Sequence, residues 1–409
     1  MKQDANQPKV ISPGSTIGIL GSGQLGRMMT IAAKQMGYRV HVYSPSHDSP
    51  AGQVADLEVQ ASFDDLDSVA AFVKHVDVVT VESESIPVAA LDIAAHFVPT
   101  FPSRNALSIC QNRRMEKQFL VDNQIPTSKF QVIRSLAELK QACHELMPAI
   151  LKTTTGGYDG KGQTVIRSHS DIEDAWQFLN TDEAILEAIV EYDFEFSIIG
   201  ARNSGGLMTA YKSIRNDHRN GILDVSISPS GLPDEANQNA SKIVFEIMNA
   251  LESVGVLTVE FFYRNGEVLV NEIAPRPHNS GHLTIEGHLT NQFEQHIRAI
   301  CGLMAGSTRQ VKPVAMANIL GQEWSEGIPK WHFGLSMPNT KIHLYGKGFP
   351  EPGRKMGHLT SIADLPEQAR EHVLAARKLL TLPPMRRPGR TQIRDTIKST
   401  VSARQYANT

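Results

Sequence analysis

Cysteine is scarce in this chain, and the three that occur stand far apart, at Cys110, Cys143 and Cys301. No Cys-x-x-Cys pair is present, so the sequence indicates neither a disulfide framework nor a cysteine-based metal site. Few and scattered cysteines are typical of proteins that work in a reducing compartment. We therefore expect a cytoplasmic protein.

Long apolar runs and an excess of one charge are also missing. No stretch approaches the roughly 18 apolar residues that a membrane helix needs. The first fifteen residues are polar and lack the apolar core of a secretion signal. The net charge of −3 gives no general attraction to nucleic acid or anionic lipid. We therefore expect neither nucleic acid nor a membrane as a partner.

The chain is long enough, at 409 residues, for two or three domains with cores of their own. Its most distinctive stretch runs from Lys152 to Gln163, where Gly156, Gly157, Gly160 and Gly162 exclude a helix. Apolar segments on both sides predict a hairpin, and a glycine-rich turn with lysines can fold over an anion. A flexible phosphate-covering flap and an ordinary glycine hairpin are both open on this stretch alone.

The segment 16–43 predicts a strand, a Gly-x-Gly-x-x-Gly turn from Gly21 to Gly26, a helix and a second strand. Such a turn presents amides at a helix N-terminus, where an anion is favoured. NAD binding is disfavoured because Ser44, not an acid, follows the second strand. Binding of another phosphate and a purely structural turn stay open.

Acidic residues occur at strand ends and inside apolar strands. Glu82 and Glu84 follow the predicted strand 76–81, where open α/β sheets bind ligands, although a solvated turn is the alternative. Glu260 and Glu272 lie on the two strands of a predicted hairpin, with Asn271 beside them. Buried carboxylates need a partner, so these three residues indicate either a Mg²⁺ site or core acids paired with Arg or Lys.

Two loops concentrate donors and cations. The proline-stiffened segment 274–282 carries Arg276, His278, Asn279 and Ser280, which suits recognition of an anion or carbonyl. His278 and His282 lack a third soft ligand nearby, which disfavours zinc. Further along, Lys347, Arg354 and Lys355 form a cationic cluster suited to a phosphate monoester.

The order of these pieces resembles the ATP-grasp superfamily, and within it the 5-(carboxyamino)imidazole ribonucleotide synthase (PurK) family. The residues that carry the resemblance are Gly21–Met28, Gly157–Gln163, Asn271–His282, and His343–Lys347 with Gly353–His358. The resemblance implies an α/β and α+β fold: an ATP-grasp fold with an N-terminal Rossmann-like (pre-ATP-grasp) domain and a small C-terminal β-rich domain. The domains expected are 1–120 (Rossmann-like), 121–200 (lid with flap), 201–310 (Mg²⁺ and nucleotide), 311–385 (β-rich) and 386–409 (a basic, disordered tail).

The resemblance also implies a reaction. ATP and bicarbonate form carboxyphosphate, which carboxylates the amine of 5-aminoimidazole ribonucleotide in purine biosynthesis, with Mg²⁺ as cofactor and a homodimer as the assembly. Residues expected at ATP are Arg113, Lys152, Gly157, Tyr158, Asp159, Gly160, Lys161, Gly162, Gln163, Glu187, Ala188, Ile189, Val190, Glu195, His218, Asn271 and Glu272. Catalytic roles fall to Asp159, Lys161, Arg276 and His278, and metal binding to Glu260, Glu272 and Asn271. The ribonucleotide is expected at Gln24, Leu25, Glu82 or Glu84, Asn279, Ser280, Lys347, Arg354 and Lys355.

Several positions depart from the family pattern. Ser22 replaces the middle glycine of the first turn, Thr153–Thr155 stand where arginines are common, and Leu283 replaces a tryptophan. None of these removes an expected metal or phosphate ligand. Three alternatives stay in view: a sister ATP-grasp enzyme that activates formate, an NAD oxidoreductase, and a non-catalytic nucleotide sensor.

Overall fold

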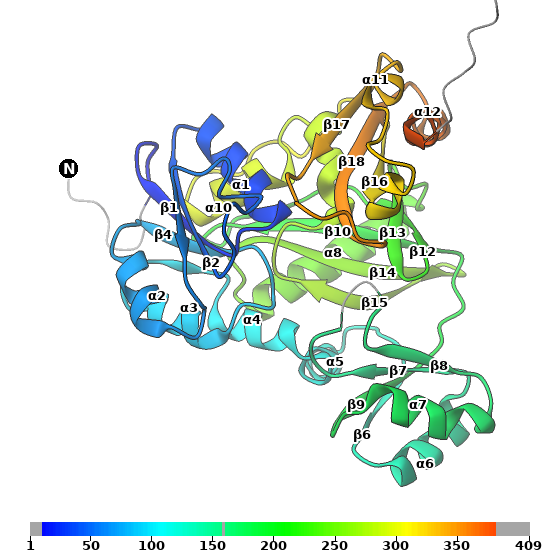
Figure 1. Cartoon of the computed structure of the whole chain (residues 1–409). Helices are drawn as coiled ribbons and strands as arrows, with labels where there is room; N and C mark the ends of the chain where they lie inside the picture. The colour runs from blue at the N-terminus through cyan, green and yellow to red at the C-terminus, as the bar shows by residue number, and fades with distance from the viewer. Residues whose placement is uncertain (1–9, 158–159, 382–409) are drawn as a thin grey trace, which may run out of the picture.

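The protein is built on three β-sheets, which Figure 1 shows in a computed structural model that describes residues 10–157 and 160–381. Tyr158, Asp159 and the predicted basic tail lie outside the described residues. The sheets contain five, four and nine strands and follow one another along the chain. Among the described helices, none combines the length and the apolar character needed to cross a membrane.

The first sheet is parallel, with the strand order β3-β2-β1-β4-β5. Its central strands β1 and β4 are almost completely buried, as expected for a parallel sheet that helices cover on both faces. The elements are β1 (Thr16–Leu20), α1 (Gln24–Gln35), β2 (Arg39–Ser44), β3 (Leu57–Gln60), α2 (Leu66–Val73), β4 (Val78–Val81), α3 (Val88–Ala95) and β5 (Thr100–Phe101).

Two helices, α4 (Arg104–Gln111) and α5 (Arg113–Asp122), lead to a small antiparallel sheet with the order β6-β9-β7-β8. Helices α6 and α7 pack on it around a separate apolar core, and the unit projects from the rest of the molecule in Figure 1. The glycine-rich stretch joins β7 to β8, as predicted. The elements are β6 (Phe130–Ile133), α6 (Leu136–Leu146), β7 (Ala149–Thr153), β8 (Gln163–Ile166), η1 (His169–Asp171), α7 (Ile172–Leu179) and β9 (Ala184–Ala188).

The largest sheet has the order β15-β14-β10-β12-β13-β16-β18-β17, with β11 paired to one end of β10. Helix α8 packs its apolar face on β10, β14 and β15. The elements up to residue 300 are β10 (Phe194–Arg202), β11 (Met208–Ala210), β12 (Ile214–Arg219), β13 (Ile222–Ser228), α8 (Asp234–Ala250), β14 (Gly255–Arg264), β15 (Glu267–Ala274), η2 (Asn279–Leu283), α9 (Thr284–Gly287) and α10 (Gln292–Ile300).

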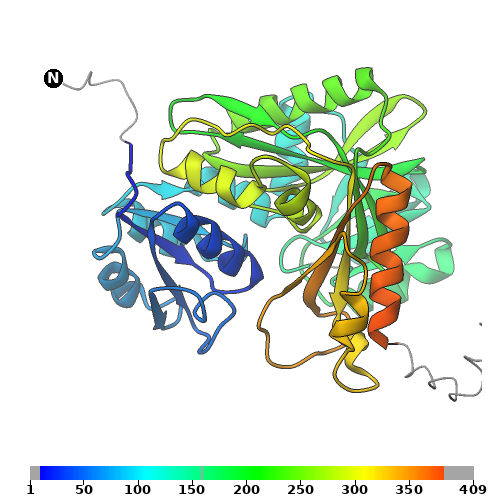
Figure 2. The same cartoon turned by 90° about the horizontal axis from the view of Figure 1, so that it is seen from above.

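The C-terminal region differs from the β-rich unit that the sequence predicts. Its strands continue the large sheet instead of forming a sheet of their own, because β16 pairs with β13. A 16-residue helix, α12, lies along these strands in Figure 2, and its Ala369, Val373 and Leu380 are buried. The elements are β16 (Val314–Leu320), η3 (Gly321–Trp324), α11 (Trp331–Gly334), β17 (Thr340–Leu344), β18 (Lys355–Ile362) and α12 (Pro366–Thr381).

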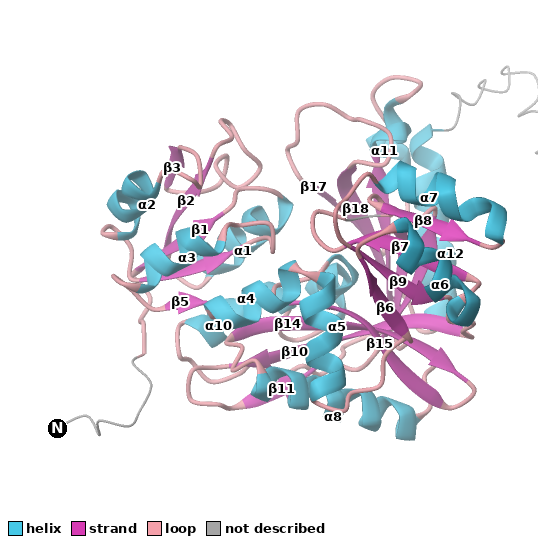
Figure 3. Ribbon diagram, turned by 90° about the horizontal axis from the view of Figure 1, so that it is seen from below, coloured by secondary structure: helices cyan, strands magenta, loops and turns pink. Residues whose placement is uncertain are grey.

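Helix α10 joins the first sheet to the third, and Figure 3 shows it beside β14. Its apolar side chains Phe293, Ile297 and Ile300 belong to the core of the five-stranded sheet. Because α10 packs on both sheets, the carboxyl end of β4 faces the large sheet. The candidate site lies in this region between the sheets, which we call the junction.

Candidate active site

The glycine-rich turn after β1 holds a carboxylate of the protein itself. Glu82 accepts hydrogen bonds from the amides of Gly23 (2.5 Å) and Gly26 (2.8 Å) at the start of α1. A side-chain carbon at Gly21, which has φ +102°, would lie 2.3 Å from Glu82. The helix N-terminus thus already has an anion, which favours the structural alternative for this turn over a phosphate site. Burial raises the pKa of Glu82, although the two amides and Lys347 favour its charged form.

The next carboxylate, Glu84, forms a two-pronged ion pair with Arg276, whose Nη2 lies 2.8 Å from Oε1 and whose Nε donates to Oε2. Burial alone would raise the pKa of Glu84, but the guanidinium outweighs it and lowers that pKa. The pair links the end of β4 to the loop after β15. It also orients Arg276, because a planar guanidinium bound at two points cannot rotate.

The nucleotide side of the site has a buried ion network that the sequence analysis missed. Glu187, at the end of β9, lies 3.1 Å from the Lys117 Nζ and 2.9 Å from the Lys152 Nζ. Both ammonium groups lower the pKa of Glu187 against the effect of burial. Lys117 is 2% exposed and also donates to the carbonyl of Asn271. Its only sequence signal was its i, i+4 spacing from Arg113, which equally fits a surface stripe.

Arg113, the first residue of α5, joins the flap to the hairpin. Its Nη2 donates to the carbonyl of Gly157 (3.1 Å), and its Nη1 lies 3.5 Å from Glu272. Gly160 and Gly162 have φ of +79° and +68°, so the flap needs glycine at both positions. Of the remaining flap residues, Lys161 and Gln163 lie on its return path into β8.

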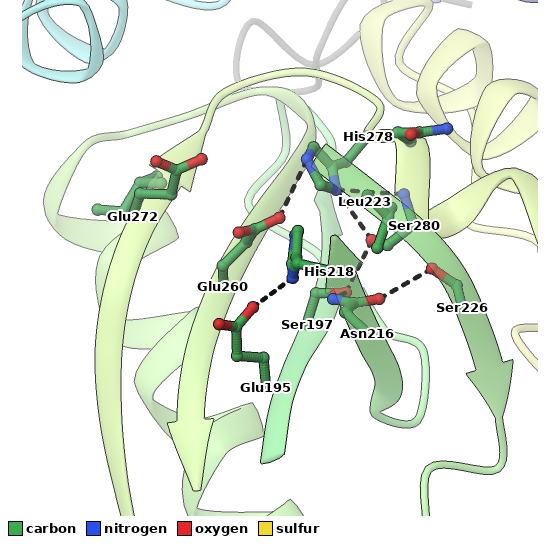
Figure 4. Close-up of polar contacts among 12 residues, drawn as sticks. Glu195, Ser197, Asn216, His218, Leu223, Ser226, Glu260, Glu272, His278 and Ser280 are labelled. Atoms are coloured by element: carbon green, nitrogen blue, oxygen red, sulfur yellow. Dashed lines mark hydrogen bonds and ion pairs between the residues drawn. The ribbon is translucent and has the colours of Figure 1, made fainter. Parts of the chain in front are cut away.

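The segment 187–190, whose residues are expected at ATP, begins with Glu187. The amides of Ala188 and Ile189 donate to the carbonyls of Lys129 and Pro148, so the segment is held in place by the protein backbone. Adenine recognition by this segment would therefore use its carbonyls and Val190. At the start of β10, Glu195 forms an ion pair with His218 of β12, as Figure 4 shows. Burial lowers the pKa of His218, but Glu195 and the other nearby carboxylates raise it overall.

Glu260 of β14 and Glu272 of β15 are direct cross-strand partners. Burial and the charge of Glu272 raise the pKa of Glu260 to about 8. A cation would relieve this repulsion, and the set of two carboxylates with Asn271 suits Mg²⁺, which takes few protein ligands and completes its shell with phosphates and water. Within the described residues, no cluster of three or more His, Cys, Asp or Glu ligands forms a closed metal site.

His278 lies at the end of the hairpin, where its Nε2 is 3.1 Å from the Glu260 Oε1 (Figure 4). Burial and Arg276 keep its pKa well below the usual value, so the imidazole is neutral. Asn279 and Ser280, which were expected to contact the ribonucleotide, face the protein interior. Ser280 is fully buried behind the imidazole, and Asn279 pairs with Asn318 through both amide groups. These two side chains support the loop from behind, and we infer no direct substrate contact for them.

The cationic cluster lies on and beside the loop between β17 and β18. The Lys347 Nζ lies 5.7 Å from the ring centroid of Tyr345, and Lys355 is near enough to Glu260 to lower its pKa. The loop also contacts the first sheet, because Gln53 donates to the carbonyl of Gly346 (3.0 Å). Arg354 points back and donates to the carbonyl of Phe349.

The structure therefore brings most predicted residues to one junction between the three sheets. At α1, the side chain of Leu25 packs in the apolar core, so only its backbone can reach a ligand, while Gln24 is half-buried. The residues that sequence analysis missed are buried polar groups: Lys117, Ser197, Asn216, Ser226 and Gln292. Ser197 and Ser226 had a signal, since each is a polar residue inside an apolar strand.

Three family models match the chain in succession. They are described as the ribonucleotide synthetase preATP-grasp domain (residues 15–111), the ATP-grasp domain (118–293) and the phosphoribosylaminoimidazole carboxylase C-terminal domain (314–372). The predicted fold class is thereby confirmed.

Several similar proteins are named N5-carboxyaminoimidazole ribonucleotide synthase. N5-carboxyaminoimidazole ribonucleotide synthase of Bacillus subtilis is 42% identical, covering 86% of this chain and 92% of that one. The bifunctional purine synthesis protein purC/E of Dictyostelium discoideum is 41% identical over 86% of this chain but only 37% of its own length.

Solved structures agree in fold. An ADP complex of purK, N5-carboxyaminoimidazole ribonucleotide synthetase, has a TM-score of 0.86 at 41% identity, covering 90% of this chain and 98% of that one. The synthase of Aspergillus clavatus, in complex with ADP and 5-aminoimidazole ribonucleotide, has a TM-score of 0.81 at 31% identity, with the same coverage.

Proposed function

The chain belongs to the family of N5-carboxyaminoimidazole ribonucleotide synthases, and on that premise we propose how its residues divide the reaction among them. The enzyme is an ATP-dependent ligase that carboxylates 5-aminoimidazole ribonucleotide in purine biosynthesis, with bicarbonate as the second substrate. The assignment of roles is supported by one observation, which is the meeting of three segments in the region between the sheets. The two-carboxylate hairpin, the flap and the cationic loop all reach one site between three sheets.

ATP binds between the four-stranded sheet and the hairpin. Arg113, Lys152 and the flap residues 157–163 hold the phosphates, and the segment 187–190 lines the adenine. Glu195, held by His218, accepts the ribose hydroxyls. Glu260, Glu272 and Asn271 hold Mg²⁺, which when bound draws charge from the phosphate oxygens during phosphoryl transfer.

The ribonucleotide binds on the other side of the junction, between the end of β4 and the loop after β17. Lys347, Arg354 and Lys355 receive its phosphate, and Gln24 and the backbone of Leu25 lie at the edge of α1. Glu82 or Glu84 lies at its ribose; each of these carboxylates is also bound within the protein, Glu82 by the amides of Gly23 and Gly26 and Glu84 by Arg276.

Bicarbonate is activated near Arg276 and His278. ATP transfers its γ-phosphoryl group to bicarbonate, and carboxyphosphate results. Arg276 stabilises its negative charge, and Glu84 keeps the guanidinium oriented. Asp159 and Lys161 are assigned to this step, and a flap that excludes water suits it, because carboxyphosphate is otherwise lost to water. The substrate amine then attacks the activated carbon and phosphate leaves.

The test is phosphate release from MgATP and bicarbonate, with and without 5-aminoimidazole ribonucleotide. Strong stimulation by the ribonucleotide is expected. Formate in place of bicarbonate should not support turnover, which separates this activity from that of a formate-activating relative. Release that is unaffected by the ribonucleotide would contradict the proposed substrate.

We propose that the protein forms a homodimer and that it is located in the cytoplasm. The homodimer rests on the family resemblance alone, and sedimentation equilibrium tests it through the measured mass. The location is supported by the three cysteines, which are all free thiols. Imaging of a tagged copy in its host tests that part separately.

A further inference from the structure

His278 has a fixed proton position that follows from a backbone contact. It is the N-cap of η2, and its Nδ1 accepts the backbone N–H of Ser280 (3.3 Å). A backbone amide can only donate, so Nδ1 carries no proton. In the neutral imidazole the proton then resides on Nε2, which faces Glu260 at 3.1 Å.

The same contact sets the direction of a buried chain of hydrogen bonds, drawn in Figure 4. Since Nδ1 only accepts, the Ser280 hydroxyl 2.9 Å away must donate to it. The hydrogen of Ser280 is then used, so the Ser197 hydroxyl must donate to Ser280 across their 2.7 Å contact. Each link thus determines the next.

Asn216 and Ser226 continue the chain without contradiction. The Ser197 oxygen needs a donor, and the Asn216 Nδ2 supplies it at 3.1 Å. The Asn216 Oδ1 then accepts from the Ser226 hydroxyl at 2.9 Å. Turning the amide round would place two acceptors against each other at Ser197, so the direction of the chain also fixes the orientation of Asn216.

The chain is built into the sheet. Ser197 is the register partner of Glu260 across β10 and β14, and Asn216 is that of Ser226 across β12 and β13. All four side chains are at most 3% exposed. Burying four connected polar side chains costs folding free energy unless all of them are hydrogen-bonded. Apolar residues would pack here at less cost, so we look for a role of these side chains in the site.

We propose that Ser280, Ser197, Asn216 and Ser226 are positioning residues that hold His278 with its proton on Nε2. The imidazole then presents a hydrogen-bond donor, and not a base, to Glu260 at the end of the hairpin. The role in catalysis rests on the proposed function: a neutral donor bound to Glu260 orients that carboxylate and, beside Arg276, takes no proton from bicarbonate.

The first test reads the tautomer directly in the wild-type protein. The protein is labelled with ¹⁵N-histidine, and two-bond ¹H–¹⁵N correlations are recorded with and without MgADP. The His278 signals are identified by their loss in His278→Gln. A protonated Nε2 and an unprotonated Nδ1 are expected. The opposite pattern would overturn the proposal, and the measurement does not depend on any activity.

The second test breaks the chain at its middle. Ser197→Ala should lower kcat about tenfold, as is usual for groups that orient a site residue through hydrogen bonds, with KM for ATP unchanged within about twofold. The control is Ser253→Ala, because Ser253 is equally buried but its hydroxyl bonds to no described residue. Equal kcat values in the two variants would overturn the role of the chain. Ser226→Ala, at the far end, supplies a milder break if Ser197→Ala is unstable.

These results are separable from the proposed function. A wild-type enzyme without ribonucleotide-stimulated phosphate release would contradict the function while the tautomer is still read from the spectrum. A normal reaction with the wrong tautomer would contradict only the inference.

Discussion

Glu260 and Glu272 are the two carboxylates of the proposed metal site. They face each other across two paired strands, and Arg113 lies 3.5 Å from Glu272. The raised pKa of Glu260, about 8, reflects a carboxylate buried without sufficient compensation. Under the proposed assignment, Mg²⁺ and the phosphates of ATP supply that compensation together.

Glu272→Ala should therefore abolish Mg²⁺-dependent turnover and leave the fold intact. The side chain of Glu272 is 41% exposed, so its removal opens no cavity in the core. Phosphate release measures the activity, and far-ultraviolet circular dichroism measures the fold. Glu267→Ala is the matched control, since Glu267 is an exposed carboxylate on the same strand. Turnover at the wild-type level in Glu272→Ala would exclude the metal assignment.

Lys117 is a second residue whose role depends on charge balance. It shares Glu187 with Lys152 and holds the carbonyl of Asn271. Lys117→Met should lower the free energy of unfolding by about 1–3 kcal/mol, because it removes the donor to the carbonyl of Asn271 while Lys152 still pairs with Glu187. Chemical denaturation measures the change. The control is Lys140→Met, which removes an exposed ion pair with Glu173. It should lower the free energy of unfolding by less than about 1 kcal/mol.

At the scale of elements, helix α10 holds the loop that carries His278. Gln292, its first residue, accepts from the amide of His278 (2.9 Å) and donates to the carbonyl of the same residue (2.7 Å). The side chain is fully buried. One amide group thus fixes both sides of the His278 backbone, so the position of the imidazole depends on where α10 begins.

Gln292→Ala should lower kcat about tenfold and leave KM for ATP nearly unchanged, because it loosens the loop and not the nucleotide site. Steady-state kinetics with each substrate varied in turn measures the two effects. Gln295→Ala serves as control: Gln295 is as buried and lies on the same helix, but it binds the amide of Gly306. A similar loss in both variants would indicate general damage to α10.

The loop between β17 and β18 is proposed to bind the phosphate of the ribonucleotide. Lys355→Ala should raise KM for the ribonucleotide about ten- to hundredfold, which is the loss of one charge-assisted contact, with little effect on KM for ATP. Lys341→Ala, on the exposed face of the neighbouring strand β17, should change neither constant. An increase confined to ATP would move Lys355 out of the ribonucleotide site.

The elements show what the sequence could and could not predict. The hairpin with Glu260 and Glu272 was predictable, because an acidic residue inside a short apolar strand is recognisable from the neighbouring residues alone. Helix α12 was missed, although it is 16 residues long, because two of its four buried residues are alanines, which give only a weak apolar stripe in the sequence. The buried chain at Ser197 and Asn216 was out of reach, since its links join strands that only the sheet order places side by side.

At the scale of the whole molecule, one histidine connects two of the sheets. His296, on α10, accepts the amide of Val256 in β14 at its Nδ1 (3.0 Å), so its Nε2 donates to the hydroxyl of Thr80 in β4 (2.9 Å). Thr80 lies two residues before Glu82, and β14 carries Glu260. The distance between the two halves of the site therefore depends on a neutral imidazole.

Burial lowers the pKa of His296 to about 3, compared with 6.5 in the unfolded chain. The neutral form is favoured in the folded state, so its contribution to stability is complete above pH 6.5 and is lost as the pH falls toward 3. Wild-type protein should lose about 2–3 kcal/mol from this group between pH 7 and pH 4.5. His296→Gln, which can make both hydrogen bonds but does not titrate, should lose correspondingly less.

Urea denaturation at the two pH values measures this difference, and the exposed His332→Gln is the control that should follow the wild type. The other buried histidines titrate in all three proteins, so their effect cancels in the comparison. An identical pH dependence in wild type and His296→Gln would show that the junction tolerates a charged imidazole. The expected result instead shows that acid weakens the contact between β4 and β14 through His296, and activity should then fall at low pH because Glu82 and Glu260 are no longer held at a fixed distance.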